Sequence, residues 1–525
     1  MIGRAGLSSK WWRVLRWAGL AAAAPALWAC TSRTLEMPMI TPTATIQTNF
    51  TQKINNEIDI LFMIDNSSSM TPMQQKLLQQ LPNFMQVLQN LPAGLPSLHV
   101  AVVSSDMGAP SDTNLPQCNQ TGGNNGQFQY MPGPGGSCTA TTINAGDTFI
   151  SDVDGVANFT NPIDQVFQCI GALGALGCGF ENQLASVDRA LGADGNPPPT
   201  TNANFLRPEA YLGIVLLTNE DDCSAPPNTT IYSLNGYGQN IANPDGPIGN
   251  YRCNGGPRGA HLCQDPGMGN AMIVPPLTPP SDAMAGPPPR LPLAMCQDNE
   301  SGNSALIPVS KFVSDIRSLK PDPNDQILVA GIIAPPTPYA VEWDPPMNGQ
   351  NTQPGELWPQ VQHSCGPSNL TLPMTNPDAT QVTSDSSFGD PGVRLAQFLS
   401  AFPNFVQASV CDSNYAQSMQ AIATKLGQLI TPPCISGKIQ NDPTTGQPEC
   451  SVIEHLNAGT PQAMDRSLPS CANSGPPCWT LTQGGMGCAN GAQLAVTDEA
   501  GINANSESST INCSLCLPGT TQPGC

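Results

Sequence analysis

The early part of the chain carries a carboxylate and a row of hydroxyls at a spacing that suits metal chemistry. In the run Asp65-Asn66-Ser67-Ser68-Ser69, a tight turn can direct the oxygens of Asp65, Ser67 and Ser69 toward one point. Oxygen ligands with little net charge suit a hard cation such as Mg²⁺ or Ca²⁺. The simpler alternative is that a serine caps the N-terminus of the next helix.

A strand and a helix are needed to position these side chains, and the hydrophobic pattern predicts both. Asp65 follows the apolar run Ile58–Ile64, which is typical of a strand buried on both faces. The segment Thr71–Asn90 has apolar residues at helical spacing. Pro82 lies inside that segment and is expected to kink or split the helix.

The alternation of apolar strands and amphipathic helices continues as far as Ile430. Further strands are expected at Leu98–Ser104, Tyr211–Thr218 and Gln326–Ile333, and further helices at Glu181–Leu191, Ser304–Leu319, Arg394–Phe402 and Tyr415–Ile430. This order predicts an α/β fold with a doubly wound, mostly parallel sheet. Ligands bind beyond the carboxyl ends of the strands in such sheets, so Asp65 is placed where a site forms.

Proline, glycine and cysteine indicate what surrounds the sheet. The chain has 55 prolines, 49 glycines and 19 cysteines in 525 residues, which predicts long irregular loops held by disulfides. Setting Cys30 aside leaves 18 cysteines, and we expect all of them to be paired in an oxidising compartment. Disulfide-stapled loop insertions are expected at about 107–160 and 223–300, and a Cys-rich C-terminal appendage at 434–525. The lone Cys513-Ser-Leu-Cys516 pattern is interpreted as structural.

The net charge restricts the possible partners of the protein, and the N-terminal residues indicate its location in the cell. The formal net charge of −20 excludes nucleic acid as a partner, because the chain has no basic stripe to replace phosphate counterions. Residues 1–29 combine four basic residues with a short apolar stretch, as in an export signal. Leu27-Trp28-Ala29-Cys30 resembles the lipobox of bacterial lipoproteins, and this implies acylation of Cys30. Thr31 then implies the outer membrane, and residues 30–53 are expected to form a tether.

The strand, the acid and the serines together resemble a known family. IDILFMIDNSSSM and the amphipathic helix after it are similar to the first segment of a von Willebrand factor A (VWA) domain with its metal-ion-dependent adhesion site. The resemblance implies that Ser67 and Ser69 bind the metal directly and that Asp65 acts through water. It assigns residues 54–433, insertions included, to one VWA-like domain with a Rossmann-like sheet.

A second segment, YLGIVLLTNEDDCS, resembles the fourth strand of the family and the loop that carries the last metal-site acid. Where the family usually has aspartate, this chain has Asn219, with Glu220 and Asp221 behind it. Asparagine can accept a hydrogen bond from a metal-bound water but adds no charge. The resemblance also implies that the strands Ile58–Ile64 and Tyr211–Leu217 are parallel neighbours.

The chain departs from the family at a second position. The threonine that usually precedes the third main helix is absent, and the matching stretch Leu176-Gly-Cys-Gly-Phe-Glu181 offers no hydroxyl. Cys178 in that stretch is expected to form a disulfide, for which nearby Cys169 is the candidate partner.

These features predict a non-enzymatic lipoprotein of the bacterial outer membrane. Its VWA-like domain is expected to bind a protein or polysaccharide ligand at the cell surface, with a divalent cation mediating adhesion. The alternative is a structural envelope scaffold with a degenerate metal site. A third hypothesis is a hydrolase in which the acids of Glu220–Asp222 oppose Asp65, but the sequence names no substrate cleft or second catalytic group.

Overall fold

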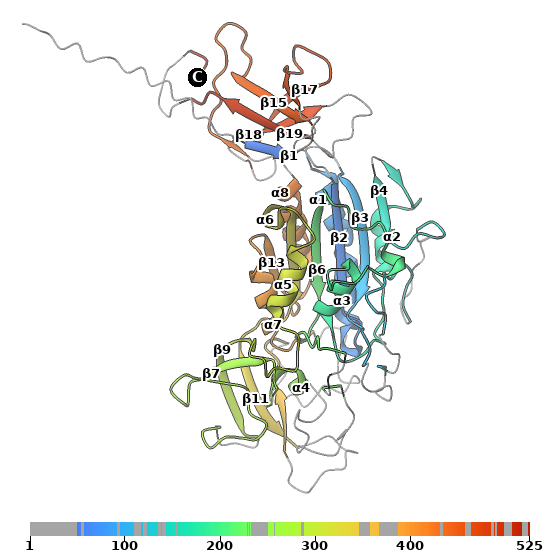
Figure 1. Cartoon of the computed structure of the whole chain (residues 1–525), viewed down its shortest axis with the longest axis vertical. Coiled ribbons are helices and arrows are strands. Elements are labelled where there is room, and N and C mark those ends of the chain that lie inside the picture. The colour runs from blue at the N-terminus through green and yellow to red at the C-terminus, as the bar shows by residue number, and fades with distance from the viewer. Residues whose placement is uncertain are drawn as a thin grey trace, which may run out of the picture. The chain divides into compact units, whose positions relative to one another are not determined.

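The computed structural model describes residues 50–525 with internal gaps (Figure 1). The gaps are residues 54–56, 92–94, 110–116, 119–122, 135–137, 139–142, 154, 228, 230, 233–249, 257, 285–287, 346–356, 367–386, 431–433, 457–463, 485–487, 489–490, 498–506 and 517–522. The expected export signal, the lipobox and all but the last four residues of the expected tether lie outside the described residues. No helix in the described part is long and apolar enough to cross a membrane.

A seven-stranded sheet forms the centre of the α/β fold, in the order β13-β10-β6-β2-β3-β4-β5. Its strands are β2 (Glu57–Ile64), β3 (Ser97–Ser104), β4 (Ile150–Val153), β5 (Val156–Ala157), β6 (Tyr211–Leu217), β10 (Ile327–Ile333) and β13 (Phe405–Ser409). The five strands from β13 to β3 are parallel, whereas β4 and β5 are antiparallel. The prediction of a mostly parallel, doubly wound sheet is therefore confirmed.

The path of the chain through this sheet reverses between β2 and β6. The strands can be numbered along the chain with β2 as strand 1 and without β5. Their spatial order from β4 to β13 is then 3-2-1-4-5-6, which is the order of a doubly wound sheet. The two strands at the reversal are parallel neighbours, as expected, in register from Ile58 opposite Tyr211 to Ile64 opposite Leu217. Ligands bind beyond the carboxyl ends of strands at such a reversal. Asp65 and Thr218 directly follow these two ends.

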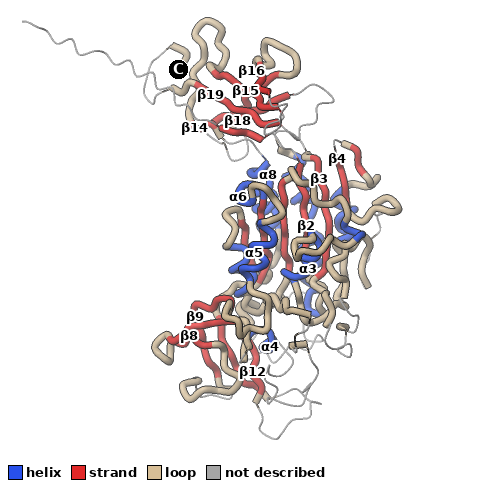
Figure 2. Tube along the Cα trace, viewed as in Figure 1, coloured by secondary structure: helices blue, strands red, loops and turns tan. Residues whose placement is uncertain are grey.

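Helices cover both faces of the sheet, because successive side chains of a strand point to opposite faces. Along β2, Ile60, Phe62 and Ile64 belong to one buried cluster, and Leu61 and Met63 belong to another. The first cluster includes α1 (Thr71–Gln89), α2 (Ile163–Ile170) and α8 (Ala416–Ile430), and the second includes α3 (Gln183–Leu191), α5 (Val309–Arg317) and α7 (Val393–Ser400). Figures 1 and 2 show these helices beside the strands.

Helix α1 continues through Pro82, so the expected split does not occur. Pro82 cannot donate to the carbonyl of Leu78, four residues earlier. The side-chain amide of Gln168 in α2 donates to that carbonyl at 3.1 Å. A neighbouring helix therefore supplies the hydrogen bond that proline removes.

We expect Gln168→Leu to lower the free energy of unfolding by about 1 kcal/mol, because the Leu78 carbonyl loses this donor. Urea unfolding followed by circular dichroism measures the change. Gln75→Leu is the matched control, because Gln75 is exposed on α1, and its effect should stay within about 0.5 kcal/mol. Equal effects in the two variants would contradict a role for Gln168.

The insertion after β6 supplies three strands of a second sheet, which is antiparallel and has the order β12-β11-β9-β7-β8 (Figure 2). Its strands are β7 (His261–Asp265), β8 (Ala271–Ile273), β9 (Arg290–Asp298), β11 (Tyr339–Asp344) and β12 (Trp358–Val361). Two of them come from residues after β10, a segment for which the sequence pattern predicts no strand. The short helices are α4 (Asn250–Asn254) and α6 (Pro323–Gln326), with 3-10 turns η1 (Ser68–Met70) and η2 (Thr200–Asn202).

The C-terminal region is more regular than its sequence suggests. It contains β14 (Ile435–Ser436), β15 (Cys450–Leu456), β16 (Met464–Leu468), β17 (Cys478–Gln483), β18 (Gly491–Thr497) and β19 (Glu507–Cys513), arranged in two antiparallel sheets. The last four residues of the expected tether form β1 (Phe50–Lys53), which pairs antiparallel with β19. These four residues therefore belong to a sheet and not to a tether.

The 18 cysteines after Cys30 form nine disulfides, which confirms the expected framework and is typical of exported proteins. The pairing expected for Cys178 is wrong: Cys178 pairs with Cys118, and Cys169 pairs with Cys138. Connectivity depends on how loops distant in sequence meet, which cysteine spacing does not encode. Cys513 and Cys516 belong to two different disulfides, in agreement with a structural role.

Candidate functional site

Asp65 lies at the carboxyl end of β2 and is held by three donors. Its backbone N–H donates to the carbonyl of Leu217, which ties together the ends of β2 and β6. One carboxylate oxygen accepts from the Ser67 backbone N–H at 2.8 Å and from the Ser105 hydroxyl at 3.1 Å. The other accepts from the Thr218 hydroxyl at 2.7 Å. Burial raises the pKa of Asp65, and these hydrogen bonds oppose the rise.

The two serines and Asn219 meet next to this carboxylate. The Ser69 hydroxyl donates to the side-chain oxygen of Asn219 at 3.1 Å, across 150 residues of sequence. The Ser67 hydroxyl lies close enough to the Asp65 carboxylate to lower its pKa but makes no hydrogen bond of good geometry, and the buried Asn219 amide nitrogen has no partner among the described residues. Asp65, Ser67 and Asn219 are buried, and Ser69 is partly exposed. Of these four residues, Ser69 is the one that solvent reaches.

The helix-cap alternative does not account for the serines. Ser67 stands at the N-cap of η1 but makes no side-chain capping hydrogen bond. The N-cap of α1 is Met70, which also makes none. Ser69 directs its hydroxyl to Asn219 instead of to a backbone N–H.

A loop before α3 covers the site and brings in an acid that sequence reasoning missed. Gly177 donates its N–H to the carbonyl of Asn66 at 2.7 Å, and a Cβ at this glycine would lie 2.1 Å from the Asn66 side-chain oxygen. Further along, Asn182 donates to the Ser105 carbonyl, and Cys223 donates to the Glu181 carbonyl. The loop is thus bonded to the ends of β2, β3 and β6.

Glu181 forms a carboxyl pair with Glu220 near Asp65. The side chains of Glu181 and Glu220 are hydrogen-bonded, and both are close enough to Asp65 to be repelled by it. Burial and the nearby carboxylates of Glu220 and Asp65 raise the pKa of Glu181 well above its usual value. Burial, with repulsion from Asp390 and Asp65, raises the pKa of Glu220 to about 8. Both carboxyls are therefore largely protonated near pH 7 when no cation is bound.

The other two acids of the Glu220–Asp222 run are engaged elsewhere. Asp221 accepts hydrogen bonds from the backbone N–H groups of Arg394 and Leu395 at the start of α7, and His261 contacts it at 2.8 Å. Asp222 forms an ion pair with Arg394 at 2.9 Å. The structure thus brings Glu220 to Asp65, but it does not bring Asp221 or Asp222 into the group.

The donor set fits a hard cation better than a soft one. Two hydroxyls, an amide and carboxylates are oxygen donors of the type that Mg²⁺ and Ca²⁺ take. In the described part of the chain, no three His, Cys, Asp or Glu side chains are arranged to hold a metal ion. A cation between Asp65 and Asn219 would therefore depend on hydroxyl and water oxygens. The partnerless oxygen of Ser67 is the atom that such a cation would satisfy.

Ser105, Thr218 and Glu181 are the members of the site that the motif did not name. Ser105 and Thr218 directly follow β3 and β6, so the rule about carboxyl ends could have found them. Glu181 lies in the stretch that the resemblance to VWA domains aligns with the family's threonine. It would have been found only if every oxygen-bearing side chain in that stretch, and not only a hydroxyl, had been considered.

Comparison with known proteins gives distant structural similarity only. The sequence matches no protein-family model and no curated protein. The open conformation of the pilus adhesin SpaC from Lactobacillus rhamnosus GG is 9% identical with a TM-score of 0.25, and the match covers 89% of this chain and 39% of that chain. The pilus adhesin RrgA from Streptococcus pneumoniae is 9% identical with a TM-score of 0.26, covering 89% and 57%. This chain spans less than two thirds of either adhesin, and similarity at this level supports no functional argument.

Proposed function

We propose that the protein is a surface-binding module that holds a divalent cation, Mg²⁺ or Ca²⁺, where β2 and β6 end. The observation that carries the proposal is the meeting of Ser67, Ser69 and Asn219 beside Asp65, with buried polar atoms left without partners. Leaving such atoms unsatisfied costs about 1–3 kcal/mol each, and a bound cation with its waters removes that cost.

The side chains at the site would have different roles in binding the cation. Ser67 and Ser69 offer hydroxyl oxygens as direct ligands, while Asp65 is already bonded to three donors and would act through a water. A bound cation would lower the pKa of Glu181 and Glu220, and the carboxylates so formed would supply the negative charge that Asn219 lacks. When bound, the cation supplies a coordination position that a carboxylate of a partner can complete.

The partner class follows from this open position and from the compartment. A protein carboxylate or an acidic polysaccharide can complete the coordination shell from the side of Ser69, which is partly exposed. Nine disulfides are typical of a chain that folds in an oxidising compartment. We propose in addition that acylation of Cys30 anchors the chain to the bacterial outer membrane, where this site would mediate adhesion.

Calorimetric titration of the exported chain with Mg²⁺ and with Ca²⁺ tests the proposal. We expect stoichiometric binding, and Ser67→Ala should weaken it by about 10- to 100-fold. Ser68→Ala is the matched control, because Ser68 lies between the two candidate ligands but is exposed, and it should leave the affinity unchanged.

Absence of cation binding would instead support the structural scaffold with a degenerate site. Equal loss in the Ser67→Ala and Ser68→Ala variants would place the cation elsewhere. Either result would overturn the cation-dependent adhesion hypothesis.

A further inference from the structure

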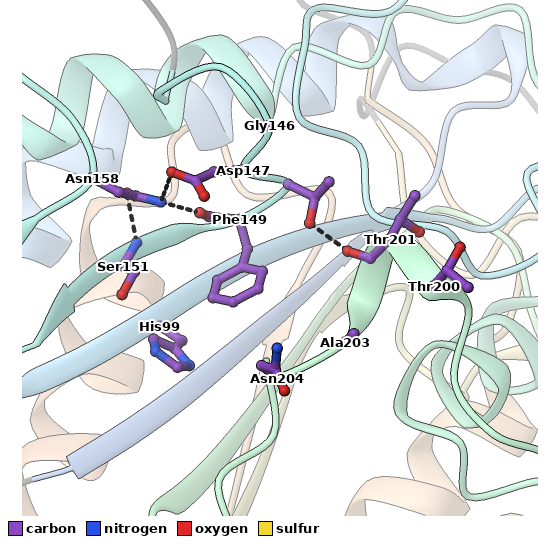
Figure 3. Close-up of a pocket in the computed structure, with 11 residues that line it drawn as sticks. His99, Gly146, Asp147, Phe149, Ser151, Asn158, Thr200, Thr201, Ala203 and Asn204 are labelled. Atoms are coloured by element: carbon purple, nitrogen blue, oxygen red, sulfur yellow. Dashed lines mark hydrogen bonds between the residues drawn. The ribbon is translucent and has the colours of Figure 1, made fainter.

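A cavity of about 510 Å³ lies beside β3 and β4, on the face of the sheet that α3 covers (Figure 3). It falls within the roughly 300–1,000 Å³ typical of small-ligand sites. Its lining comes from three segments: His99 of β3, the residues around β4 and β5, and the residues around η2. None of the acids at the candidate cation site lines it.

The cavity and the candidate cation site are at opposite ends of β2. His99 is paired in register with Asp59 of β2, and Asp59 precedes Asp65 by six residues. Six residues of extended strand span about 20 Å. A ligand in the cavity would therefore not contact a cation held beside Asp65.

An aromatic ring forms part of the wall. Phe149 is half-buried and packs against His99, with ring centroids 4.9 Å apart, and against Phe205 at 5.4 Å. Behind it, Phe128 contacts both Phe149 and Phe205. The ring is therefore held rigidly while part of it faces the cavity, as Figure 3 shows. Such a ring offers a flat surface to the C–H groups of a ligand.

His99 contributes an acceptor. Its Nδ1 lies 2.8 Å from the carbonyl oxygen of Phe205, and because a carbonyl only accepts, Nδ1 carries the hydrogen. Burial lowers the pKa of His99 to about 4, so the ring is neutral near pH 7. Nε2 is then an acceptor, and it makes no hydrogen bond within the described part of the chain.

The polar residues at the rim of the cavity include Ser151, Asn158, Thr200 and Asn204. Some of their side chains are held by hydrogen bonds and others are free. The Asn158 side chain accepts from the Ser151 backbone N–H and donates to Asp147 and to the Phe149 carbonyl, which fixes the β4–β5 hairpin (Figure 3). By contrast, the side chains of Ser151, Thr200 and Asn204 make no hydrogen bond among the described residues. These free hydroxyl and amide groups line the cavity.

The charge of the lining selects the class of ligand. Asp147 is the one acidic side chain among the lining residues, and no lysine or arginine lines the cavity. The whole chain carries a formal net charge of −20. A phosphate, sulfate or carboxylate ligand would find no cationic partner here, and an apolar ligand would leave the free polar groups unsatisfied.

We propose that this cavity binds a neutral saccharide, with the Phe149 ring against a sugar face and with His99, Thr200 and Asn204 bonded to sugar hydroxyls. Hydroxyl groups both donate and accept, so they can satisfy the His99 acceptor and the Asn204 amide in one ligand. The site is additional to the proposed cation site and does not depend on it.

The test exposes the full exported chain, in EDTA, to an array of neutral, sialylated and sulfated oligosaccharides and to an array of immobilised heptapeptides. We expect binding to neutral oligosaccharides that persists without divalent cations. Calorimetry then measures the affinity for the neutral oligosaccharide that binds most strongly on the array. Because EDTA removes divalent cations, failure here is distinct from failure of the cation-dependent function.

Two rim variants locate the binding. Asn204→Gly removes the amide and keeps the left-handed backbone that Asn204 adopts at φ 66°. We expect it, and Thr200→Val separately, to weaken binding about three- to tenfold, the loss of one neutral hydrogen bond. Asn270→Gly is the matched control, because Asn270 is exposed with φ 65° in the turn between β7 and β8, and it should bind as the unmodified chain does.

Several results would overturn the proposal. They are binding only to sialylated or sulfated glycans, binding only to peptides, no binding on either array, and neutral-glycan binding that the two rim variants leave unchanged.

Discussion

Arg394→Met is expected to lower the free energy of unfolding by about 3–5 kcal/mol, because it leaves two buried carboxylates without their cation. The Arg394 guanidinium is fully buried and is paired with Asp222 and Asp298, and it also donates to the Ile307 carbonyl. Truncation removes every one of these bonds at once. Denaturant unfolding with disulfides intact, followed by tryptophan fluorescence, measures the loss.

A partly exposed ion pair supplies the control. Arg189 lies 3.9 Å from Asp194, and both side chains are partly exposed. Arg189→Met should therefore cost about 1 kcal/mol or less. If Arg394→Met cost no more than Arg189→Met, the buried network would not stabilise the fold.

Removing the Cys118–Cys178 disulfide should have the second large effect, on stability and on cation affinity together. It closes a sequence separation of 60 residues, for which chain entropy gives about 4 kcal/mol. Cys178 also belongs to the loop that holds Glu181 against the ends of β2, β3 and β6. The Cys118→Ser/Cys178→Ser double variant is therefore expected to unfold more easily and to bind a divalent cation about tenfold more weakly.

The Cys471–Cys478 disulfide offers a matched comparison. Its sequence separation is 7 residues, which gives about 2 kcal/mol, and it lies in the C-terminal region, outside the candidate site. Cys471→Ser/Cys478→Ser should leave cation affinity unchanged. A similar loss of affinity in both double variants would mean that global destabilisation, not the position of Glu181, sets the binding strength.

The central sheet could be predicted because its signal is local. The continuous apolar runs of β2, β6 and β10 follow from burial on both faces, and the carboxyl-end rule places Asp65 and Asn219 at one edge. By contrast, β13 is a short edge strand whose residues are exposed or half-buried, so its sequence carries no buried run. In the sheet made from segments on either side of β10, β11 is buried throughout, but Glu342 and Asp344 interrupt its apolar residues, so it also shows no continuous apolar run.

The rest of the site depends on contacts distant in sequence. Glu181 reaches Asp65 only because a disulfide and three backbone hydrogen bonds hold its loop over the strand ends. Pro82 misled the helix prediction because Gln168, 86 residues later, supplies the missing donor. In both cases the deciding interaction has no trace in the local pattern.

The pairing of β1 with β19 has a mechanical consequence. If the chain is anchored through Cys30 and a partner pulls on the site beyond β2, tension enters the described part of the chain at Phe50. It meets the hydrogen bonds of β1 first, and β1 is held by four residue pairs, whereas β2 is held by eight to β3 and seven to β6. The strands β1 and β19 would then separate first under load, and the sheet that carries the binding site would stay folded.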